Sequence, residues 1–180
     1  MAIVGAGPYG LSIATHLRSR GIEFRIFGST MRTWLDMPPG VALKSFDFAT
    51  NIYTPWPGHT FKEWAAARGQ ALEEPIPMSV FAEYGVEIQT QLVPEVEDVE
   101  VRSVVPAAGG GFGVTLSTGE SFDADSVVVA VGLKSYARMP ATFANHPGRV
   151  FHTSDIPDYA RFRGQDVTVI GGGQSALEAG

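Results

Sequence analysis

The sequence predicts an α/β protein, and three features of its 180 residues support this. At the start of the chain, "MAIVGAGPYG" and the residues after it give a short apolar strand, a glycine turn and an amphipathic helix. The same order returns at the end, in "VIGGGQSALEAG". Between them, residues 99–124 alternate in short strands separated by turn residues, as in an antiparallel meander. An apolar share of 44% with 18% charged residues is typical of a globular domain.

The first unit is predicted from the position of its glycines. Residues 2–4 are a buried strand, the helix after the turn ends at Gly21, and residues 22–27 are a second strand. A Gly-x-Gly-x-x-Gly turn in this context is typical of Rossmann-like dinucleotide binding, because the glycines allow a tight turn, close approach of a pyrophosphate, and packing of helix on strand. The free N–H groups at the helix start then face the anion. The residues expected at this site are Gly5, Gly7, Pro8, Tyr9 and Gly10.

The middle of the chain is predicted to hold loops, two helices and the meander. Residues 28–60 are loop-like, because they are rich in Pro, Gly, Thr and aromatic residues. Thr60 and Glu63 form a capping box for a helix, and residues 80–92 are a further helix with one apolar face. The acidic run at 95–100 is expected to face water. The expected strands are 99–105, 112–116 and 121–124 in the meander, then buried strands at 126–131 and 167–170.

The second glycine turn predicts the start of another nucleotide-binding unit. Gly171 and Gly173 follow a strand, and Ala176 stands at the third position, where a small residue still permits close packing. A βαβ unit needs roughly thirty residues, whereas nine follow Gly171. We therefore expect the N-terminal portion of a longer enzyme, with residues 1–135 as part of a first nucleotide-binding domain and 136–180 as a linker and the start of a second, truncated one.

The residues after the second strand leave two interpretations of the first site open. Adenine dinucleotide binders usually end this strand with Asp or Glu, which accepts from the ribose hydroxyls, but here the position is Gly28. The ribose must then be held by backbone groups, by a hydroxyl of Ser29 or Thr30, or by Arg32. The same side chains would suit a 2′-phosphate, so residue chemistry alone permits NADP at the first site.

Four segments together resemble the flavin-containing monooxygenase superfamily: "GAGPYGLS", "VVVAVG", "GRVFHTSD" and "VIGGGQSALEAG". The subgroup resembled most is the N-hydroxylating branch, which oxidises amines of amino acids and diamines, because "GGGQSALE" is similar to its GxGQSAxE motif. In the F-x-G-x-x-x-H-x-x-x-W signature, Gly148 and His152 match, whereas His146 and Ile156 replace the two aromatic residues. The resemblance implies a flavoprotein with two dinucleotide-binding domains, FAD at the first turn and NADP at the second.

The resemblance also implies roles for individual residues. His152 would help to dock the two nucleotide domains near NADP, Trp34 would face the flavin, and a cation at Lys44 would stabilise negative charge there. The alternatives are an ordinary surface histidine, a packing tryptophan and a solvated lysine. The cofactor-binding residues expected beyond the first turn are Ser29, Arg32, Trp34, Lys44, Gly132, His152, Gly171, Gly173, Gln174 and Ser175.

The function that the resemblance implies is FAD-dependent, NADPH-driven monooxygenation of a small nucleophilic substrate, an amine in the N-hydroxylating branch, with O2 as the oxidant. The cofactor carries such chemistry, so the sequence identifies no catalytic side chain. One alternative is another FAD- and NAD(P)-dependent oxidoreductase, such as a flavin disulfide reductase, against which the lack of cysteine counts. The other is a nucleotide-binding module without turnover.

Composition argues against several other classes. A net charge of −6 gives no basic footprint for nucleic acid or an anionic membrane. The longest apolar runs are too short to span a bilayer, and a strand at the first residue leaves no signal peptide. Without cysteines, and with histidines that lack ligand spacing, no metal site is expected. We expect a cytoplasmic protein by elimination, and a homo-oligomer is left open.

Overall fold

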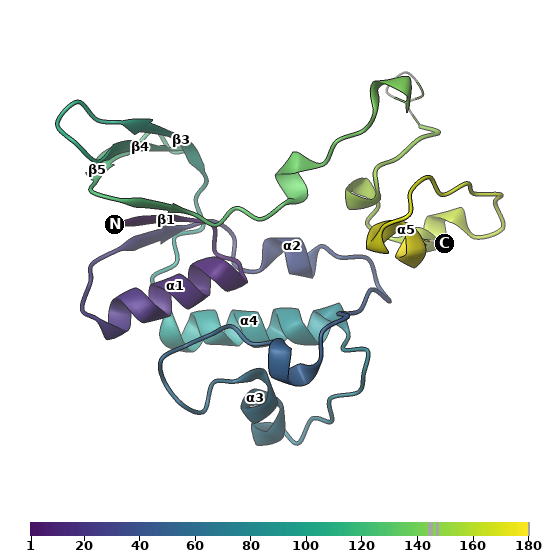
Figure 1. The fold of residues 1–180 in the computed structure, drawn as a ribbon, viewed down its shortest axis with the longest axis horizontal. Coiled ribbons are helices and arrows are strands. Elements are labelled where there is room, and N and C mark those ends of the chain that lie inside the picture. Colours follow the sequence, from purple (N-terminus) through teal and green to yellow (C-terminus); the bar gives the residue numbers. More distant parts are fainter. Residues whose placement is uncertain (144–145, 147, 180) are drawn as a thin grey trace.

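A three-stranded parallel sheet holds the first glycine turn. The computed structural model describes residues 1–143, 146 and 148–179. Its parallel strands are β1 (Ala2–Val4), β2 (Arg25–Phe27) and β6 (Val127–Val129), in the order β2-β1-β6. Helix α1 (Pro8–Ser19) connects β1 to β2 (Figure 1). The predicted α/β fold and first βαβ unit are therefore confirmed, although β2 begins three residues later than the sequence suggested.

Three further α-helices lie between β2 and the meander. Helix α3 (Phe61–Ala67) begins with the predicted capping box, in which Thr60 Oγ1 accepts from the Glu63 N–H at 3.2 Å and Glu63 Oε2 accepts from the Thr60 N–H at 3.0 Å. Helix α4 (Met78–Leu92) runs beside α1 (Figure 1). The short helix α2 (Arg32–Leu35) lies where the sequence predicted only loop.

The main core lies between α1, α4 and the parallel sheet. Tyr84 of α4 is fully buried there, and its hydroxyl donates to the carbonyl of His59 at 2.6 Å and accepts from the N–H of Ile52 at 3.2 Å. Burial raises the pKa of Tyr84 to about 12. Tyr84 thereby links the loop before α3 to helix α4. Other buried members of this core are Ile3, Leu11, Ala14, Ile26, Met31, Phe61, Ile76 and Ile88.

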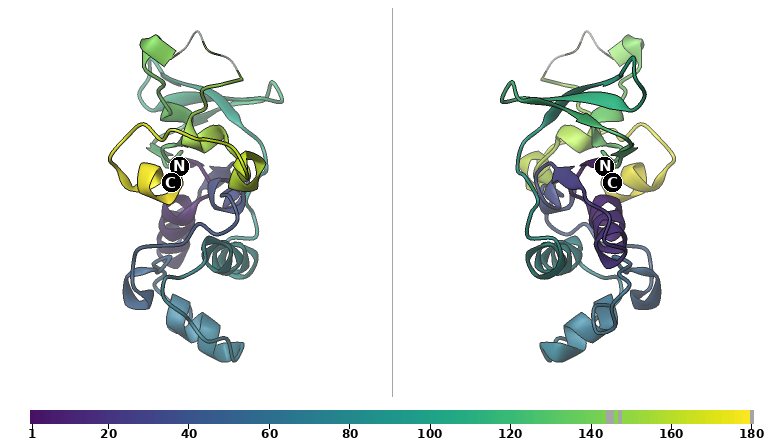
Figure 2. Two further views of the ribbon diagram at one scale, coloured as in Figure 1. Left: turned by 90° about the vertical axis from the view of Figure 1, so that its right-hand side faces the viewer. Right: turned by 90° about the vertical axis from the view of Figure 1, so that its left-hand side faces the viewer.

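The meander forms a second, separate sheet. Its strands are β3 (Val101–Pro106), β4 (Phe112–Leu116) and β5 (Ser121–Ala124), paired antiparallel in sequence order as predicted. Apolar residues of β4 and β5 pack with Ala2 and Phe27 of the parallel sheet in a smaller core. Figure 2 shows the meander at one end of the molecule and α3 at the other.

The last part of the chain differs from the prediction. The linker leads away from the sheet through short 3₁₀ turns to helix α5 (Gln174–Ala179), which lies apart from the sheet in Figure 1. The strand predicted at 167–170 is wrong: the segment is extended, but nothing pairs with it in the part of the chain that the structure describes. A strand requires a hydrogen-bonded neighbour, and Ile170 is instead 68% exposed. Residues 144, 145, 147 and 180 of the predicted linker and second domain lie outside the described residues.

Candidate nucleotide-binding site

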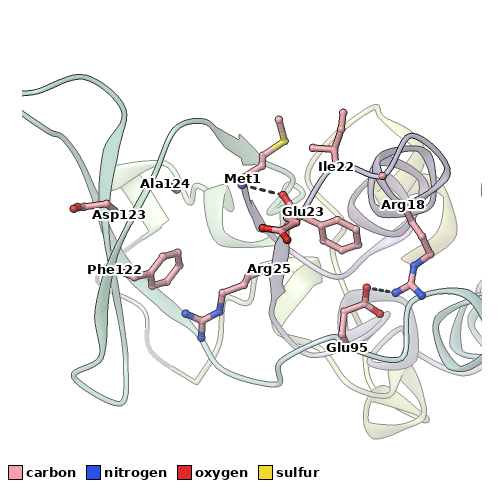
Figure 3. Close-up of a pocket in the computed structure, with 11 residues that line it drawn as sticks. Met1, Arg18, Ile22, Glu23, Arg25, Glu95, Phe122, Asp123 and Ala124 are labelled. Carbon is pink, nitrogen blue, oxygen red and sulfur yellow. Dashed lines mark hydrogen bonds and ion pairs between the residues drawn. The ribbon is translucent and has the colours of Figure 1, made fainter.

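A hollow at the amino ends of β1 and β2 is not the expected site. It is lined by Met1, Glu23, Arg18, Phe122 and neighbouring residues (Figure 3). Arg18 is paired with Glu95 within it, so its charge is already neutralised. Ligands of open α/β sheets bind at the carboxyl ends of the strands. A nucleotide is therefore expected at the opposite edge of the sheet, where the glycine turn follows β1.

The first and third glycines of the turn are required by packing. Gly5 has φ +113°, and a β-carbon on it would lie 2.3 Å from the carbonyl oxygen of Ala130, just after β6. A β-carbon on Gly10 would lie 1.9 Å from the carbonyl oxygen of Gly5. Since both approaches are too close for any side chain, these two glycines set how α1 meets the sheet.

The second glycine borders open space. Gly7 is the residue before α1, has an ordinary φ of −85°, and a β-carbon on it would meet no atom within 4 Å. No side chain caps the helix start, and Pro8 has no N–H to satisfy. The N–H groups of the first helical turn thus have no intrahelical partner and face the space beside Gly7 and the exposed Tyr9. This arrangement fits the pyrophosphate of a dinucleotide.

The end of β2 explains the missing carboxylate. Gly28 has φ +121°, a conformation that Asp and Glu rarely adopt. Its N–H donates to the carbonyl of Glu97 at 2.9 Å, which draws the segment after α4 alongside β2. Ser29 Oγ donates to Asp98 Oδ1 at 2.5 Å. Glycine is therefore a structural requirement at this position.

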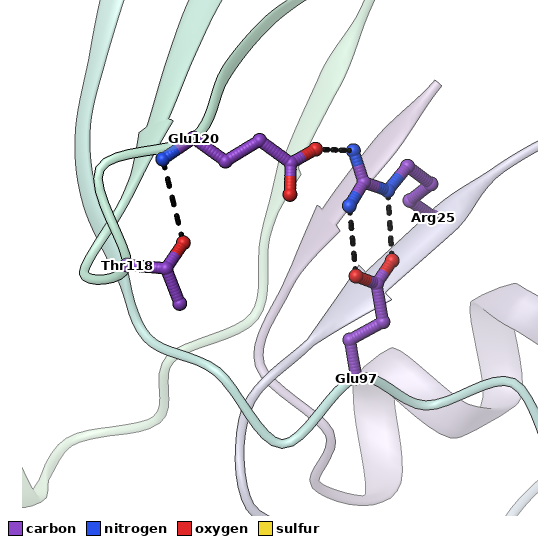
Figure 4. Close-up of polar contacts among 4 residues, drawn as sticks. All are labelled: Arg25, Glu97, Thr118 and Glu120. Atoms are coloured by element: carbon purple, nitrogen blue, oxygen red, sulfur yellow. Dashed lines mark hydrogen bonds and ion pairs between the residues drawn. The ribbon is translucent and has the colours of Figure 1, made fainter.

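An arginine holds that segment in place. Arg25 of β2 donates from Nε and Nη2 to the two carboxylate oxygens of Glu97, at 2.7 and 2.8 Å, and from Nη1 to Glu120 at 2.7 Å (Figure 4). Its guanidinium also lies over the ring of Phe122, 4.4 Å from the centroid. The hydrogen bonds from Arg25 lower the pKa of the Glu97 carboxyl. The expectation that the acidic run simply faces water is therefore wrong for Glu97, because β2 supplies it with a cation.

Two of the predicted cofactor residues, Arg32 and Trp34, make side-chain contacts within the chain. Arg32 Nε donates to Asp36 Oδ2 at 2.9 Å, one helical turn away, and Lys134 of the linker approaches the same oxygen at 3.1 Å. Bonds from Arg32 and then Lys134 lower the pKa of the Asp36 carboxyl. The ring of Trp34 packs edge-on against Phe81 of α4, with centroids 4.9 Å apart.

Helix α5 contacts the loop after α2 and a 3₁₀ turn of the linker. Lys44 Nζ lies 3.2 Å from Glu178 Oε1 of α5. Gly132 has φ +69° and turns the chain from β6 into the linker. His152 Nδ1 accepts from the N–H of Ser154 at 3.2 Å and caps the 3₁₀ turn at Thr153–Asp155, which packs against α5.

The second glycine turn has a local conformation similar to that of the first, but it is exposed to solvent. Gly171 has φ +146°, and the carbonyl of Gly173 accepts from the N–H groups of Ala176 and Leu177 at 3.0 and 3.2 Å, as at a helix start. Gln174 Nε2 donates within α5 to Glu178 at 3.0 Å. The three glycines and Ser175 are exposed. The structure thus brings Gly171, Gly173, Gln174 and Ser175 together on one turn.

Among residues 1–143, 146 and 148–179, no group of three or more His, Asp or Glu side chains is placed to hold a metal ion. Within the same ranges, no helix has the length and hydropathy needed to cross a membrane.

The chain is similar to known oxidoreductases over nearly its whole length. The family model for pyridine nucleotide-disulphide oxidoreductases matches residues 2–180. Ferredoxin–NADP reductase from Ralstonia nicotianae is 29% identical over 98% of this chain and 45% of its own length. Thioredoxin reductase from Rickettsia prowazekii is 27% identical over 98% of this chain and 49% of its own. The chain therefore spans about half the length of these relatives.

Solved structures share the fold at lower identity. L-lysine 6-monooxygenase from Pseudomonas syringae superposes with a TM-score of 0.73, at 21% identity, over 99% of this chain and 48% of that one. DfoA from Erwinia amylovora, a cadaverine monooxygenase solved with FAD, gives a TM-score of 0.67 at 18% identity, over 86% of this chain and 40% of that one. A steroid monooxygenase bound to NADP gives 0.63 at 24% identity, over 73% and 25%.

Proposed function

The chain belongs to the pyridine nucleotide-disulphide oxidoreductase family, and from this membership we propose that it binds FAD over its first glycine turn and serves in an NADPH-driven monooxygenase. Residues 1–135 would form the FAD-binding part, and residues 136–180 the linker and the start of the NADP-binding part. The proposed substrate is a small nucleophile, an amine, with O2 as the second substrate.

The observation that carries the FAD site is the open space beside Gly7. The turn on either side of it is fixed by contacts that admit no β-carbon, yet Gly7 itself has room and an ordinary φ. Packing therefore gives no reason for glycine at this position, whereas a pyrophosphate on the helix start does.

The test of the FAD site is Gly7→Val in the holoprotein. The valine side chain would occupy the space of the pyrophosphate, so we expect the variant to purify without flavin and to melt close to the wild-type apoprotein. Gly109→Val is the matched control, since Gly109 is also an open glycine without a positive φ but lies in the β3–β4 hairpin. A Gly7→Val protein that purifies with its full complement of flavin would contradict the assignment.

The second turn is the proposed NADP site. Its support is the turn at Gly171–Gly173 followed directly by α5, together with a family defined by pyridine nucleotide chemistry. Gln174 and Ser175 would contribute groups at the helix start, and His152 would hold the neighbouring 3₁₀ turn against α5. Gly132 and Lys44 would act between the two parts, through the linker turn and the ion pair with Glu178.

The residues of this chain would bind and orient rather than react. When bound, FAD supplies hydride acceptance and the activation of O2. The glycine turn would anchor its pyrophosphate, while Trp34 and the α4 core behind it would keep the loop after β2 rigid. The fold shared with lysine and cadaverine monooxygenases supports oxygenation of an amine.

The alternative is a reductase, which the similarity to thioredoxin reductase and ferredoxin–NADP reductase supports. The 180 residues contain no cysteine and so contribute no thiol pair to disulfide reduction. Supplying the full-length protein with FAD, NADPH and O2 distinguishes the two. We expect amine-stimulated O2 uptake with a hydroxylamine product from lysine or cadaverine. NADPH-dependent reduction of a disulfide or of ferredoxin, without O2 uptake linked to an amine, would contradict the monooxygenase.

A further inference from the structure

The end of β2 lacks the acid that dinucleotide sites of this type usually place there. That acid accepts hydrogen bonds from the ribose hydroxyls of the adenosine. Gly28 holds the position with φ +121°, and a β-carbon on it would lie 3.5 Å from the backbone nitrogen of Ala6. The residue thus lies in van der Waals contact with the glycine turn, and its positive φ is unsuited to Asp or Glu. A carboxylate contact to the ribose must therefore come from another part of the chain.

The segment after α4 extends the parallel sheet beside β2. Phe27 and Glu97 pair as a parallel bridge, the Glu97 N–H donates to the carbonyl of Ile26 at 2.9 Å, and the Gly28 N–H donates to the carbonyl of Glu97 at 2.9 Å. The bidentate bond from Arg25 to Glu97 fixes this register. In a parallel pairing the next residue, Asp98, must lie past the carboxyl end of β2, at the edge that carries the glycine turn.

Ser29 and Asp98 meet at that edge. Ser29 Oγ donates to Asp98 Oδ1 at 2.5 Å, and both side chains are exposed. A carboxylate has about four acceptor sites, so the bond from Ser29 leaves capacity for a ribose diol. Of the other side chains considered for the ribose, Thr30 and Arg32, the arginine donates to Asp36 at 2.9 Å.

From this placement, and on the basis of the proposed FAD site, we propose that Asp98 replaces the missing strand-end acid and accepts from the ribose hydroxyls of the FAD adenosine. Ser29 is a positioning residue that orients the carboxylate. The negative charge of Asp98 also opposes a 2′-phosphate at this position, so the first site selects FAD over NADP. The interpretation that residue chemistry had left open, NADP at the first turn, is thereby disfavoured.

The test is a titration of apoprotein with two ligands. They are FAD and the FAD analogue whose adenosine carries 2′-deoxyribose, and binding is followed by quenching of flavin fluorescence. A hydrogen bond to a charged group corresponds to about tenfold in affinity or more. We expect Asp98→Ala to weaken FAD binding by about tenfold and Ser29→Ala by less. Wild type should prefer FAD over the analogue, and Asp98→Ala should lose this preference.

The matched control is Glu100→Ala, which removes an exposed acid two residues along the same segment and should leave both affinities unchanged. A general loss of negative charge would instead affect both variants equally. Asp98→Ala protein that binds FAD as tightly as wild type, or that still prefers it over the analogue, would overturn the role of Asp98 while leaving the FAD site itself standing. Wild-type protein that does not bind FAD would overturn both.

Discussion

The two glycine turns have similar sequences but very different surroundings. The first lies against the strand that ends at Val129, where Gly5 packs closely against the Ala130 carbonyl. Ile3, in the strand before this turn, is fully buried. The second follows a segment whose last residue, Ile170, is 68% exposed. Both turns nonetheless start a helix. The comparison shows that the glycine pattern specifies the turn and the helix start, whereas the strand before them depends on partners far away in the chain.

The largest loss of stability is expected from a substitution that disrupts the first turn only. Gly10→Val would place a side chain on the Gly5 carbonyl oxygen, which a β-carbon would already approach to 1.9 Å. Because the contact is with a backbone atom, and both residues belong to a turn and a helix packed on the sheet, neither can move aside cheaply. We expect a loss of about 4 kcal/mol or more in the free energy of unfolding. Gly172→Ala is the control in the second turn, where a β-carbon meets nothing within 4 Å, and should change little. Urea denaturation followed by circular dichroism measures both, and equal effects would refute the difference in enclosure.

The next effect compares the isoleucines before the two turns. Ile3 is fully buried, so Ile3→Ala removes packed methyl groups and should cost about 3 kcal/mol. Ile170→Ala alters an exposed side chain and should stay within about 0.5 kcal/mol. Thermal unfolding in the same buffer checks the pair. A destabilisation by Ile170→Ala as large as that by Ile3→Ala would mean that the second turn is enclosed in solution.

The smallest effect concerns the ion pair that draws residues 97–98 to the first turn. Glu97→Gln weakens the bidentate bond from Arg25, and because Glu97 is about one third exposed we expect only about 1 kcal/mol at neutral pH. The hydrogen bond from Arg25 lowers the folded-state pKa of Glu97, so its stabilisation is present above the ordinary carboxyl pKa of 4.5 and is lost as the pH falls through the lowered value.

Unfolding curves of wild type and Glu97→Gln at several pH values measure this. The difference between them should be constant from pH 7 to about pH 5 and should vanish at lower pH. A difference that persists unchanged into strong acid would show that packing, and not the ionised carboxylate, accounts for the effect of the substitution.

Much of the fold from β1 to β6 could be predicted because its signals are local. The glycine spacing, the capping box at Thr60 and the alternation in the meander each involve residues close in sequence. The strand at 167–170 was predicted by the same local pattern and does not form, because pairing is a tertiary property. Helix α2 was missed because Met31 before it adopts φ +53°, a left-handed conformation that a methionine rarely adopts and does not indicate in a sequence.

The candidate site, too, could be predicted only where its residues are close in sequence. The turn residues Gly5, Gly7 and Gly10 were evident from their spacing. Asp98 was not, because it reaches Ser29 only through the bridge between Phe27 and Glu97, 70 residues apart in the chain. In the sequence it stands within an acidic run, which is more often a solvated surface. The one indication in the sequence was the missing acid at the end of β2, which implies that an acid elsewhere in the chain replaces it.

We assign FAD to the first glycine turn and NADP to the second. A matched pair of valine variants at equivalent glycines of the two turns tests this assignment most directly. Gly7 and Gly173 each hold the second position of a turn, have no positive φ, and border open space, so valine should leave the fold intact at both. Calorimetric titration of the full-length wild type, Gly7→Val and Gly173→Val with FAD and with NADP gives six affinities. We predict that Gly7→Val loses FAD and retains NADP, and that Gly173→Val retains FAD and loses NADP. Loss of NADP in Gly7→Val together with retention of FAD would place the cofactors the other way round and contradict the assignment.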